Sequence, residues 1–164
     1  MTMRLVAVIG TALFLVVYGN AQEGPGTLKS TGDFIQGLTS QAVNNAEREN
    51  HIHLDYSVES IKTVDKILGR VHEAYVKNPN SVSVSNLASV YGAYVGEVIR
   101  RTESSARWKR DDKPGGEDSY LLVWGQTLHA YPMLWCQARI MSGDRGSIWR
   151  AYSVAKEFAS HRVL

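Results

Sequence analysis

The sequence is poor in cysteine and has no long apolar run after its first 21 residues. Cys136 is the only cysteine among the 164 residues, so no disulfide can form within the chain and stability has to come from packing. After residue 21, no apolar stretch approaches the roughly 20 residues that a membrane-spanning helix needs. Internal repeats and extended low-complexity tracts are also missing from the sequence. A disulfide scaffold, a multi-span membrane protein and a repeat protein are therefore excluded as classes.

A strong charge of either sign is missing as well. The chain has 18 Lys+Arg against 16 Asp+Glu. Such a near-neutral balance argues against electrostatic capture of nucleic acid or anionic lipid as the main role. Catalytic signatures are absent too, because the sequence contains no Gly-x-Ser-x-Gly, no His-Glu-x-x-His and no glycine-rich phosphate loop. We expect no nucleic-acid partner and no cofactor, and we assign no catalytic residue.

The first 21 residues have the order of a secretory signal peptide. Arg4 supplies a positive charge, an apolar run follows from Leu5 to Tyr18, and the small residues Gly19 and Ala21 precede a cleavage point. We expect cleavage after Ala21 and a periplasmic or secreted mature protein that no longer touches the membrane. The apolar run is shorter than a spanning helix needs, and retention as an anchor is the alternative.

The rest of the chain divides into a linker over residues 22–53 and one domain over residues 54–164. Inside the linker, one apolar helical face behind Asp33 as N-cap predicts a peripheral helix from about Asp33 to Glu47. The polar residues that follow this face predict loose docking or fraying. The length of the domain suits a single hydrophobic core.

Two amphipathic helices are predicted at the start of the domain. The first follows residues 54–57 (LDYS), repeats apolar residues at three- and four-residue steps as far as Tyr75, and ends before Asn78. The second begins at about Ser83 and has a wide apolar face up to Ile99. The short link between them favours an antiparallel pair.

The second helix carries small residues every four positions. Ala88, Gly92 and Gly96 line one strip, and each glycine costs about 1 kcal/mol relative to alanine inside a helix. This cost predicts that another backbone, that of the sheet or of the first helix, approaches the strip closely.

Three short strands and two more helices are predicted after residue 101. Alternation over residues 106–110, an apolar and aromatic run over 120–124 and the segment 127–131 predict an antiparallel meander, with turns at residues 114–116 and 125–126. A helix then starts at Pro132 and stops at Gly143, and Ser147 caps a last helix. The expected fold class is α+β, with two N-terminal helices, a three-stranded meander, two C-terminal helices and the peripheral helix.

Four short motifs resemble a family of small bacterial domains of unknown function. They are LDYS at residues 54–57, YGAYVGEV at residues 91–98, Trp108, and the stretch from Gly125 to Pro132. The resemblance implies a bacterial source and a compact α+β module, without catalytic residues that could be transferred. Some domains of this size are discussed as immunity proteins against secreted toxins, which is an analogy of kind.

Histidine, cysteine and glycine-rich segments offer three weaker hypotheses. His51, His53 and Asp55 could contribute to a metal site, although a polar linker and a helix cap explain them as well. Cys136 could pair with His129 as a nucleophile, but its apolar helical context favours an unreactive core thiol. Residues 143–147 (GDRGS) could bind an anion through Arg145 and free backbone N–H groups, or form a simple turn.

Tryptophan and arginine gather in the C-terminal part, and both are favoured where proteins bind tightly. Strand alternation turns Arg107 away from Trp108, so one sheet face is expected to be cationic. The candidate binding residues are Trp108, Arg107, Arg110, Trp124, Arg139 and Arg145.

The sequence therefore predicts a non-enzymatic, exported protein-binding module of inhibitor or immunity type, whose partner is an envelope protein or a secreted toxin. It would use the strand-and-turn region from Arg107 to Gly125. The alternatives are a small-ligand or metal-binding protein, and a hydrolase acting on envelope material with Glu97, His129 or the His51, His53 and Asp55 group in its site.

Overall fold

The computed structural model describes residues 30–111, 119–125 and 127–161. The expected signal peptide, the turn expected at residues 114–116 and Gln126 of the expected hairpin lie outside the described residues. Within the described part of the chain, no helix is both long enough and apolar enough to cross a membrane.

Helices dominate the described chain, and a small sheet interrupts them once. The elements in chain order are α1 (Thr31–Asn50), α2 (Glu59–Lys77), the 3-10 helix η1 (Pro79–Ser81), α3 (Val84–Thr102), β1 (Arg107–Asp111), β2 (Ser119–Trp124), β3 (Leu128–Ala130), α4 (Pro132–Ser142), the 3-10 helix η2 (Gly143–Gly146) and α5 (Ile148–His161). The expected α+β class and the three-stranded antiparallel sheet are confirmed.

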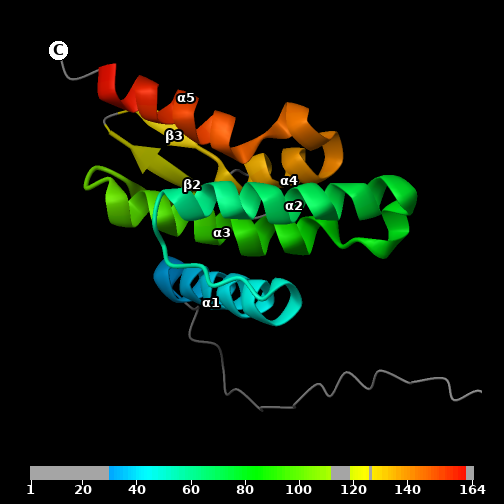
Figure 1. The fold of residues 1–164 in the computed structure, drawn as a ribbon. Coiled ribbons are helices and arrows are strands. Elements are labelled where there is room, and N and C mark those ends of the chain that lie inside the picture. Colours follow the sequence, from blue (N-terminus) through cyan, green and yellow to red (C-terminus); the bar gives the residue numbers. More distant parts are fainter. Residues whose placement is uncertain (1–29, 112–118, 126, 162–164) are drawn as a thin grey trace, which may run out of the picture.

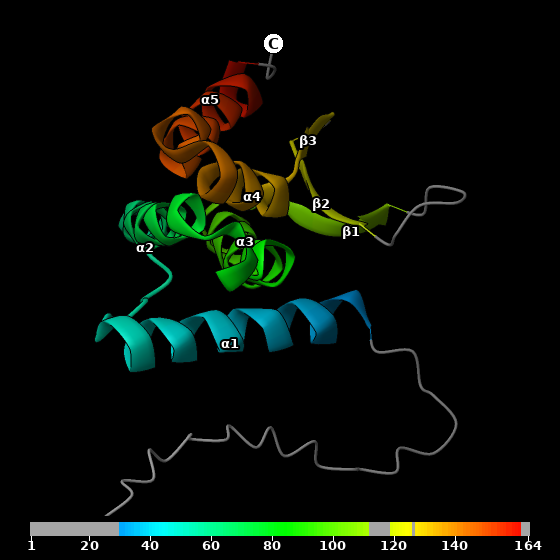
Figure 2. The same ribbon diagram turned by 90° about the vertical axis from the view of Figure 1, so that its right-hand side faces the viewer.

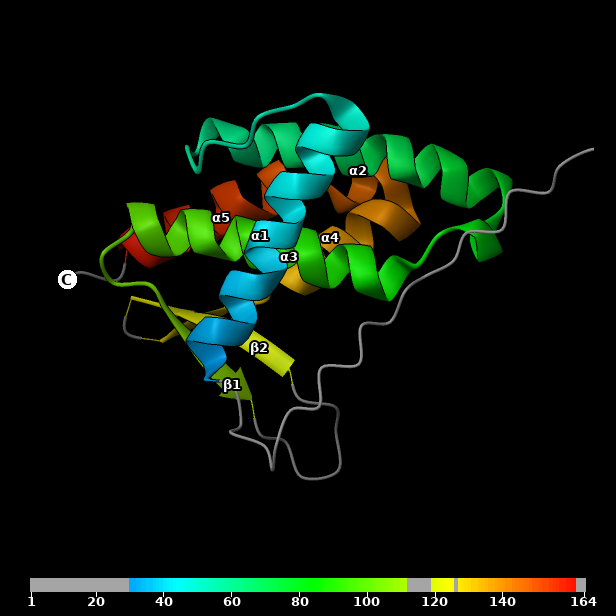
Figure 3. The same ribbon diagram turned by 90° about the horizontal axis from the view of Figure 1, so that it is seen from below.

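The helices form layers around the central pair α2 and α3 (Figure 1). Helices α4 and α5 cover one side of this pair, and α1 crosses its other side (Figure 2). Seen from below, α1 runs across α3 with its N-terminal end beside β1 (Figure 3). The start of α1, the end of α3 and β1 therefore meet at one place.

The sheet has the strand order β1-β2-β3. Trp108 on β1 pairs with Leu122 on β2, and Leu122 pairs with Ala130 on β3. Leu122 and Ala130 are buried, so this row of the sheet faces the helices. Alternation turns the neighbouring Arg107 to the opposite face, where its side chain is exposed although its partner Val123 on β2 is buried.

The N-cap of helix α1 lies one turn before the residue that the sequence predicts as its N-cap. Ser30 caps it, because the Ser30 hydroxyl accepts from the Asp33 N–H and the Asp33 carboxylate accepts from the Ser30 N–H, which is a capping box. Ala42 and Ala46 are fully buried in the core shared with α3. This face docks closely, and the expectation of loose docking is wrong for the described helix because small side chains let the two helices approach.

The strip of small residues on α3 packs against α4 and against a tryptophan side chain. A Cβ added at Gly92 would lie 2.4 Å from the Met133 Cα of α4, and one added at Gly96 would lie 2.2 Å from the Trp108 ring. The predicted close approach of another backbone is confirmed at Gly92. The expected neighbours, the sheet backbone and the first helix, were wrong, because it is α4 that packs here and the sheet contributes the Trp108 side chain.

Candidate functional site

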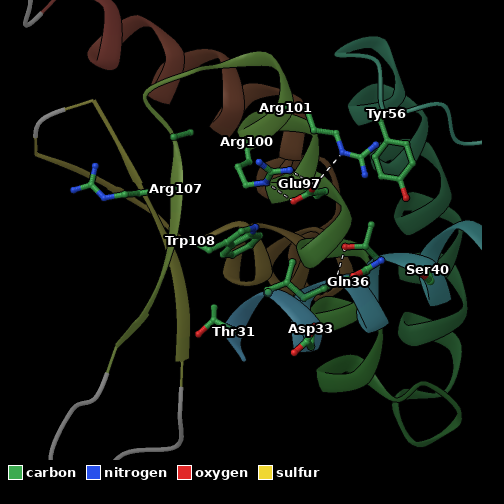
Figure 4. Close-up of a pocket in the computed structure, with 14 residues that line it drawn as sticks. Thr31, Asp33, Gln36, Ser40, Tyr56, Glu97, Arg100, Arg101, Arg107 and Trp108 are labelled. Carbon is green, nitrogen blue, oxygen red and sulfur yellow. Dashed lines mark hydrogen bonds and ion pairs between the residues drawn. The ribbon is translucent and has the colours of Figure 1, made fainter. Parts of the chain in front are cut away.

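A polar cleft of about 700 Å³ opens where α1, α3 and β1 meet (Figure 4). Its volume falls within the roughly 300–1,000 Å³ of typical ligand sites. The lining residues come from α1, the α1–α2 loop, the end of α3 and the start of β1. They are Thr31, Gly32, Asp33, Ile35, Gln36, Thr39, Ser40, Tyr56, Glu97, Arg100, Arg101, Ala106, Arg107 and Trp108.

Tyr56 borders the cleft from a loop with an uncommon backbone. Its φ of 62° lies in the left-handed region, which bulky residues rarely adopt. The Tyr56 N–H donates to the Tyr94 hydroxyl at 2.8 Å, and this hydroxyl donates to Ser60 at 2.9 Å. Burial raises the pKa of Tyr94, so its hydroxyl keeps the proton that it donates. The LDYS loop is thus fixed from the core by a buried tyrosine.

A carboxylate and two guanidinium groups lie at the end of α3. Glu97 accepts from Arg100 Nη2 at 2.7 Å and Nε at 2.9 Å, and from Arg101 Nε at 3.0 Å. Burial acts to raise the pKa of Glu97, but the hydrogen bonds and charges of the two arginines outweigh it and hold the pKa below its ordinary value. Glu97 is therefore ionised at neutral pH, and both of its oxygens are engaged.

Trp108 forms the wall opposite Tyr56. It points from β1 towards α3, and its ring lies over Gly96 (Figure 4). The indole Nε1 is buried and has no hydrogen-bond partner among the described residues. An unsatisfied buried donor costs about 1–3 kcal/mol. Trp108 thus gives the cleft a half-buried aromatic wall, while its indole donor is buried and unused among the described residues.

Helix α1 closes the third side with short polar side chains. Gln36 and Ser40 are exposed on it and line the cleft. Thr39 is buried and donates to the Ile35 carbonyl at 2.7 Å, so its hydroxyl is already used. The Asp33 carboxylate is engaged by the capping box with Ser30. Few of these polar groups of α1 would therefore compete with a ligand for hydrogen bonds from the arginines of the cleft.

The structure separates the six candidate binding residues. Arg107 and Trp108 line the cleft, while Arg110 is exposed further along β1. Trp124 is 1% exposed and belongs to the core, so it offers no surface to a partner. Arg145 is exposed on η2, away from the cleft lining. Arg107 and Trp108 are thus the two that the cleft brings together.

Arg139 belongs to a structural ion pair. Its Nε lies 2.7 Å from Asp65 Oδ1 in a pairing without hydrogen-bond geometry, since the Nε donates to the Asp65 carbonyl at 3.1 Å. Both side chains are largely buried between α2 and α4. The interpretation of Arg139 as a surface contact is wrong because its charge is used inside the fold.

At residues 143–147, where an anion site and a simple turn were the alternatives, a carboxylate of the protein itself lies at the helix start. The Ser147 hydroxyl donates to Asp65 Oδ2 at 2.7 Å, and the Trp149 N–H donates to the same oxygen at 3.3 Å. Asp65 therefore caps α5 from α2, and it occupies the position that an anion would take.

The histidine hypotheses gain no support from the geometry. His51 ends α1 in a left-handed conformation with φ 54°, and Asp55 accepts from the Ser57 N–H at 2.9 Å. In the described part of the chain, no three His, Cys, Asp or Glu side chains are grouped so that they could hold a metal ion. Cys136 is fully buried whereas His129 is exposed, so the two form no catalytic pair.

Sequence reasoning missed Tyr56 and Arg100 as functional candidates, and it counted Arg101 among the C-terminal arginines without choosing it as a binding residue. Signals for them were present, because Tyr56 stands in the LDYS motif and Glu97 precedes the two arginines by three and four residues on one helix. Their convergence with Trp108 depends on how α3 meets β1, which the local pattern does not contain.

No protein-family model, no curated protein and no solved structure matches the chain. The family resemblance drawn from the short motifs stays a prediction. Three of those motifs contribute residues to the cleft, namely Tyr56, Glu97 and Trp108.

Proposed function

We propose that the protein is an exported bacterial binding module without catalytic activity, which holds a partner protein in the manner of an inhibitor or immunity protein. The partner would be an envelope protein or a secreted toxin. Part of the partner enters the cleft between α1, α3 and β1. In this proposal α1 belongs to the functional unit, because it supplies one wall of the cleft.

The observation that best supports the proposal is that Glu97 is ionised and fully hydrogen-bonded. It is the carboxylate of the cleft that lies nearest the two guanidinium groups, and both of its oxygens accept their hydrogen bonds. A general acid or base works best with a pKa near the operating pH, whereas that of Glu97 is lowered. Because Asp33 is used in a helix cap, the cleft suits binding better than proton transfer.

The walls of the cleft support a protein partner. Tyr56 and Trp108 present aromatic surface, and Arg101 and Arg107 present guanidinium groups. These side-chain types carry much of the energy at protein interfaces. The core around Tyr94 and Gly96 fixes both walls, so little conformational entropy is lost when a partner enters.

The proposal is tested by capture with matched charge reversals. The purified chain is immobilised and exposed to envelope and secreted proteins of its source, in parallel with Arg107→Glu and Arg145→Glu. Both arginines are exposed, but only Arg107 lines the cleft. We expect a stoichiometric partner that the wild type and Arg145→Glu retain and Arg107→Glu loses. Cleavage of the expected signal peptide is checked separately, because the mass of the purified chain should then correspond to a start at Gln22.

Two outcomes would count against this function. A partner that both variants retain equally would move the binding surface away from the cleft. No specific partner from any fraction, with all three chains folded by circular dichroism, would remove the protein-binding function itself.

A further inference from the structure

We infer that the cleft recognises a carboxylate of an acidic segment in its partner, and that Arg101 receives it edge-on while Arg107 adds a second positive charge. This inference rests on the proposed function and names the chemistry of the partner.

Two contacts fix the guanidinium of Arg101. Its Cζ lies 3.6 Å from the centroid of the Tyr56 ring, so the ring supports the group from one side. Its Nε donates to Glu97 at 3.0 Å, which limits the rotation of the group. Figure 4 shows the side chain lying against Tyr56 at the edge of the cleft. A fixed planar fork is the donor arrangement that matches a carboxylate in two parallel hydrogen bonds.

The terminal nitrogens of Arg101 remain for a ligand. Among the described residues, its hydrogen bonding uses Nε alone, and its side chain is 46% exposed. Arg100 differs, because it already gives Glu97 two bonds. The two side chains are equally exposed, at 46%, so the difference is that Arg101 keeps both terminal nitrogens while Arg100 keeps only Nη1.

The positive and negative charges at the end of α3 do not balance. Two guanidinium groups share the single carboxylate of Glu97, so one positive charge remains beside the cleft. Arg107 adds another from β1, and it is exposed. Glu97 is itself only 12% exposed, so an incoming anion is shielded from it by the arginines.

The start of α1 limits the kind of anion. Helix N-termini attract phosphate, but here the Asp33 carboxylate already lies at the first turn of α1 in its capping box. A dianion placed against α1 would meet this negative charge. A singly charged carboxylate held on the Arg101 side avoids it, which favours acidic side chains or a chain terminus over phosphate.

The test measures binding of the full chain to fluorescein-labelled hexaglutamate and hexaglutamine by fluorescence anisotropy. We expect hexaglutamate to bind at least about tenfold more tightly, and its affinity to fall as salt is raised. Arg101→Lys keeps the charge but loses the fork, and it should weaken hexaglutamate binding about tenfold, as expected for one charge-assisted hydrogen bond. Arg145→Ala, outside the cleft lining, should bind as the wild type does.

Three results would overturn the inference. They are equal affinity for the two peptides, unchanged affinity in Arg101→Lys, and displacement of hexaglutamate by inorganic phosphate at lower concentration than by acetate. A captured partner without hexaglutamate binding would overturn the acidic class and leave the proposed function standing. Hexaglutamate binding without any captured partner would support the ligand chemistry and overturn the protein-binding function.

Discussion

Gly96 decides where Trp108 can lie. The glycine has no Cβ, and one added there would lie 2.2 Å and 2.3 Å from two carbons of the Trp108 ring and 3.3 Å from Pro132 Cγ. The cost of a glycine inside α3 is thus offset by an aromatic ring that packs directly on the helix. Since the same ring forms one wall of the cleft, this residue links packing to the site.

We expect Gly96→Ala to lower the free energy of unfolding by about 1–3 kcal/mol, because overpacking at the Trp108 ring outweighs the gain in helix propensity. Urea denaturation followed by circular dichroism measures the loss, and tryptophan fluorescence reports the displaced ring. Gly37→Ala is the matched control, because nothing lies within 4 Å of its added Cβ on α1. It should stabilise the protein by about 0.5–1 kcal/mol. Equal stability of the two variants, with unchanged fluorescence, would contradict this account.

The sequence could predict the small strip on α3 but not its neighbours. Four-residue spacing and the cost of glycine are local properties, so they indicate that something approaches Gly92 and Gly96. That α4 supplies a backbone at one and β1 a ring at the other follows from the packing of elements distant in sequence. The same reason explains why Trp108 was identified without Tyr56 or Arg101.

At the scale of elements, α5 is capped by a residue of α2. Asp65 accepts from the Ser147 hydroxyl and the Trp149 N–H, positions 82 and 84 residues away. It also pairs with Arg139 of α4 at 2.7 Å. One side chain of α2 therefore joins α2 to both α4 and α5.

The pair should behave as a buried ion pair. We expect Arg139→Ala to lower the free energy of unfolding by about 3–5 kcal/mol, because the Asp65 carboxylate is left without its counter-charge. A double-mutant cycle with Asp65→Ala should give an interaction energy of about 1–3 kcal/mol. Urea denaturation of the four proteins measures it, and Arg150→Ala, an exposed arginine of α5, should change stability by no more than about 0.5 kcal/mol. Strictly additive losses would show that the two charges do not interact.

Local patterns predicted the type of these elements better than their contacts. The sequence around Ser147 correctly predicted a helix start, and it left an anion site and a simple turn as alternatives, since free N–H groups occur at every helix N-terminus. It could not show that the anion is Asp65, because the carboxylate comes from α2. The bounds of α1 were also missed at its start, where Ser30 and not Asp33 is the N-cap.

At the scale of the whole molecule, one core connects all the helices. Buried residues from α1 through α5 and from the sheet belong to a single hydrophobic cluster, and Cys136 lies within it at 0% exposure. Burial and the negative charge of Asp65 raise the pKa of the Cys136 thiol. The thiolate is the reactive form, so the native thiol should be inert at neutral pH.

Cys136 should therefore report opening of the whole core. We expect a disulfide reagent such as dithionitrobenzoate to modify native protein only through unfolding, so that the labelling rate rises with urea in parallel with the unfolding equilibrium. The chain has one cysteine, so complete labelling in denaturant should release one equivalent of thionitrobenzoate per chain. A labelling rate that does not depend on urea would instead mean that α4 opens locally. In that case α4 would not be held by the common core, and the close contact of Met133 with Gly92 would have to break in native protein.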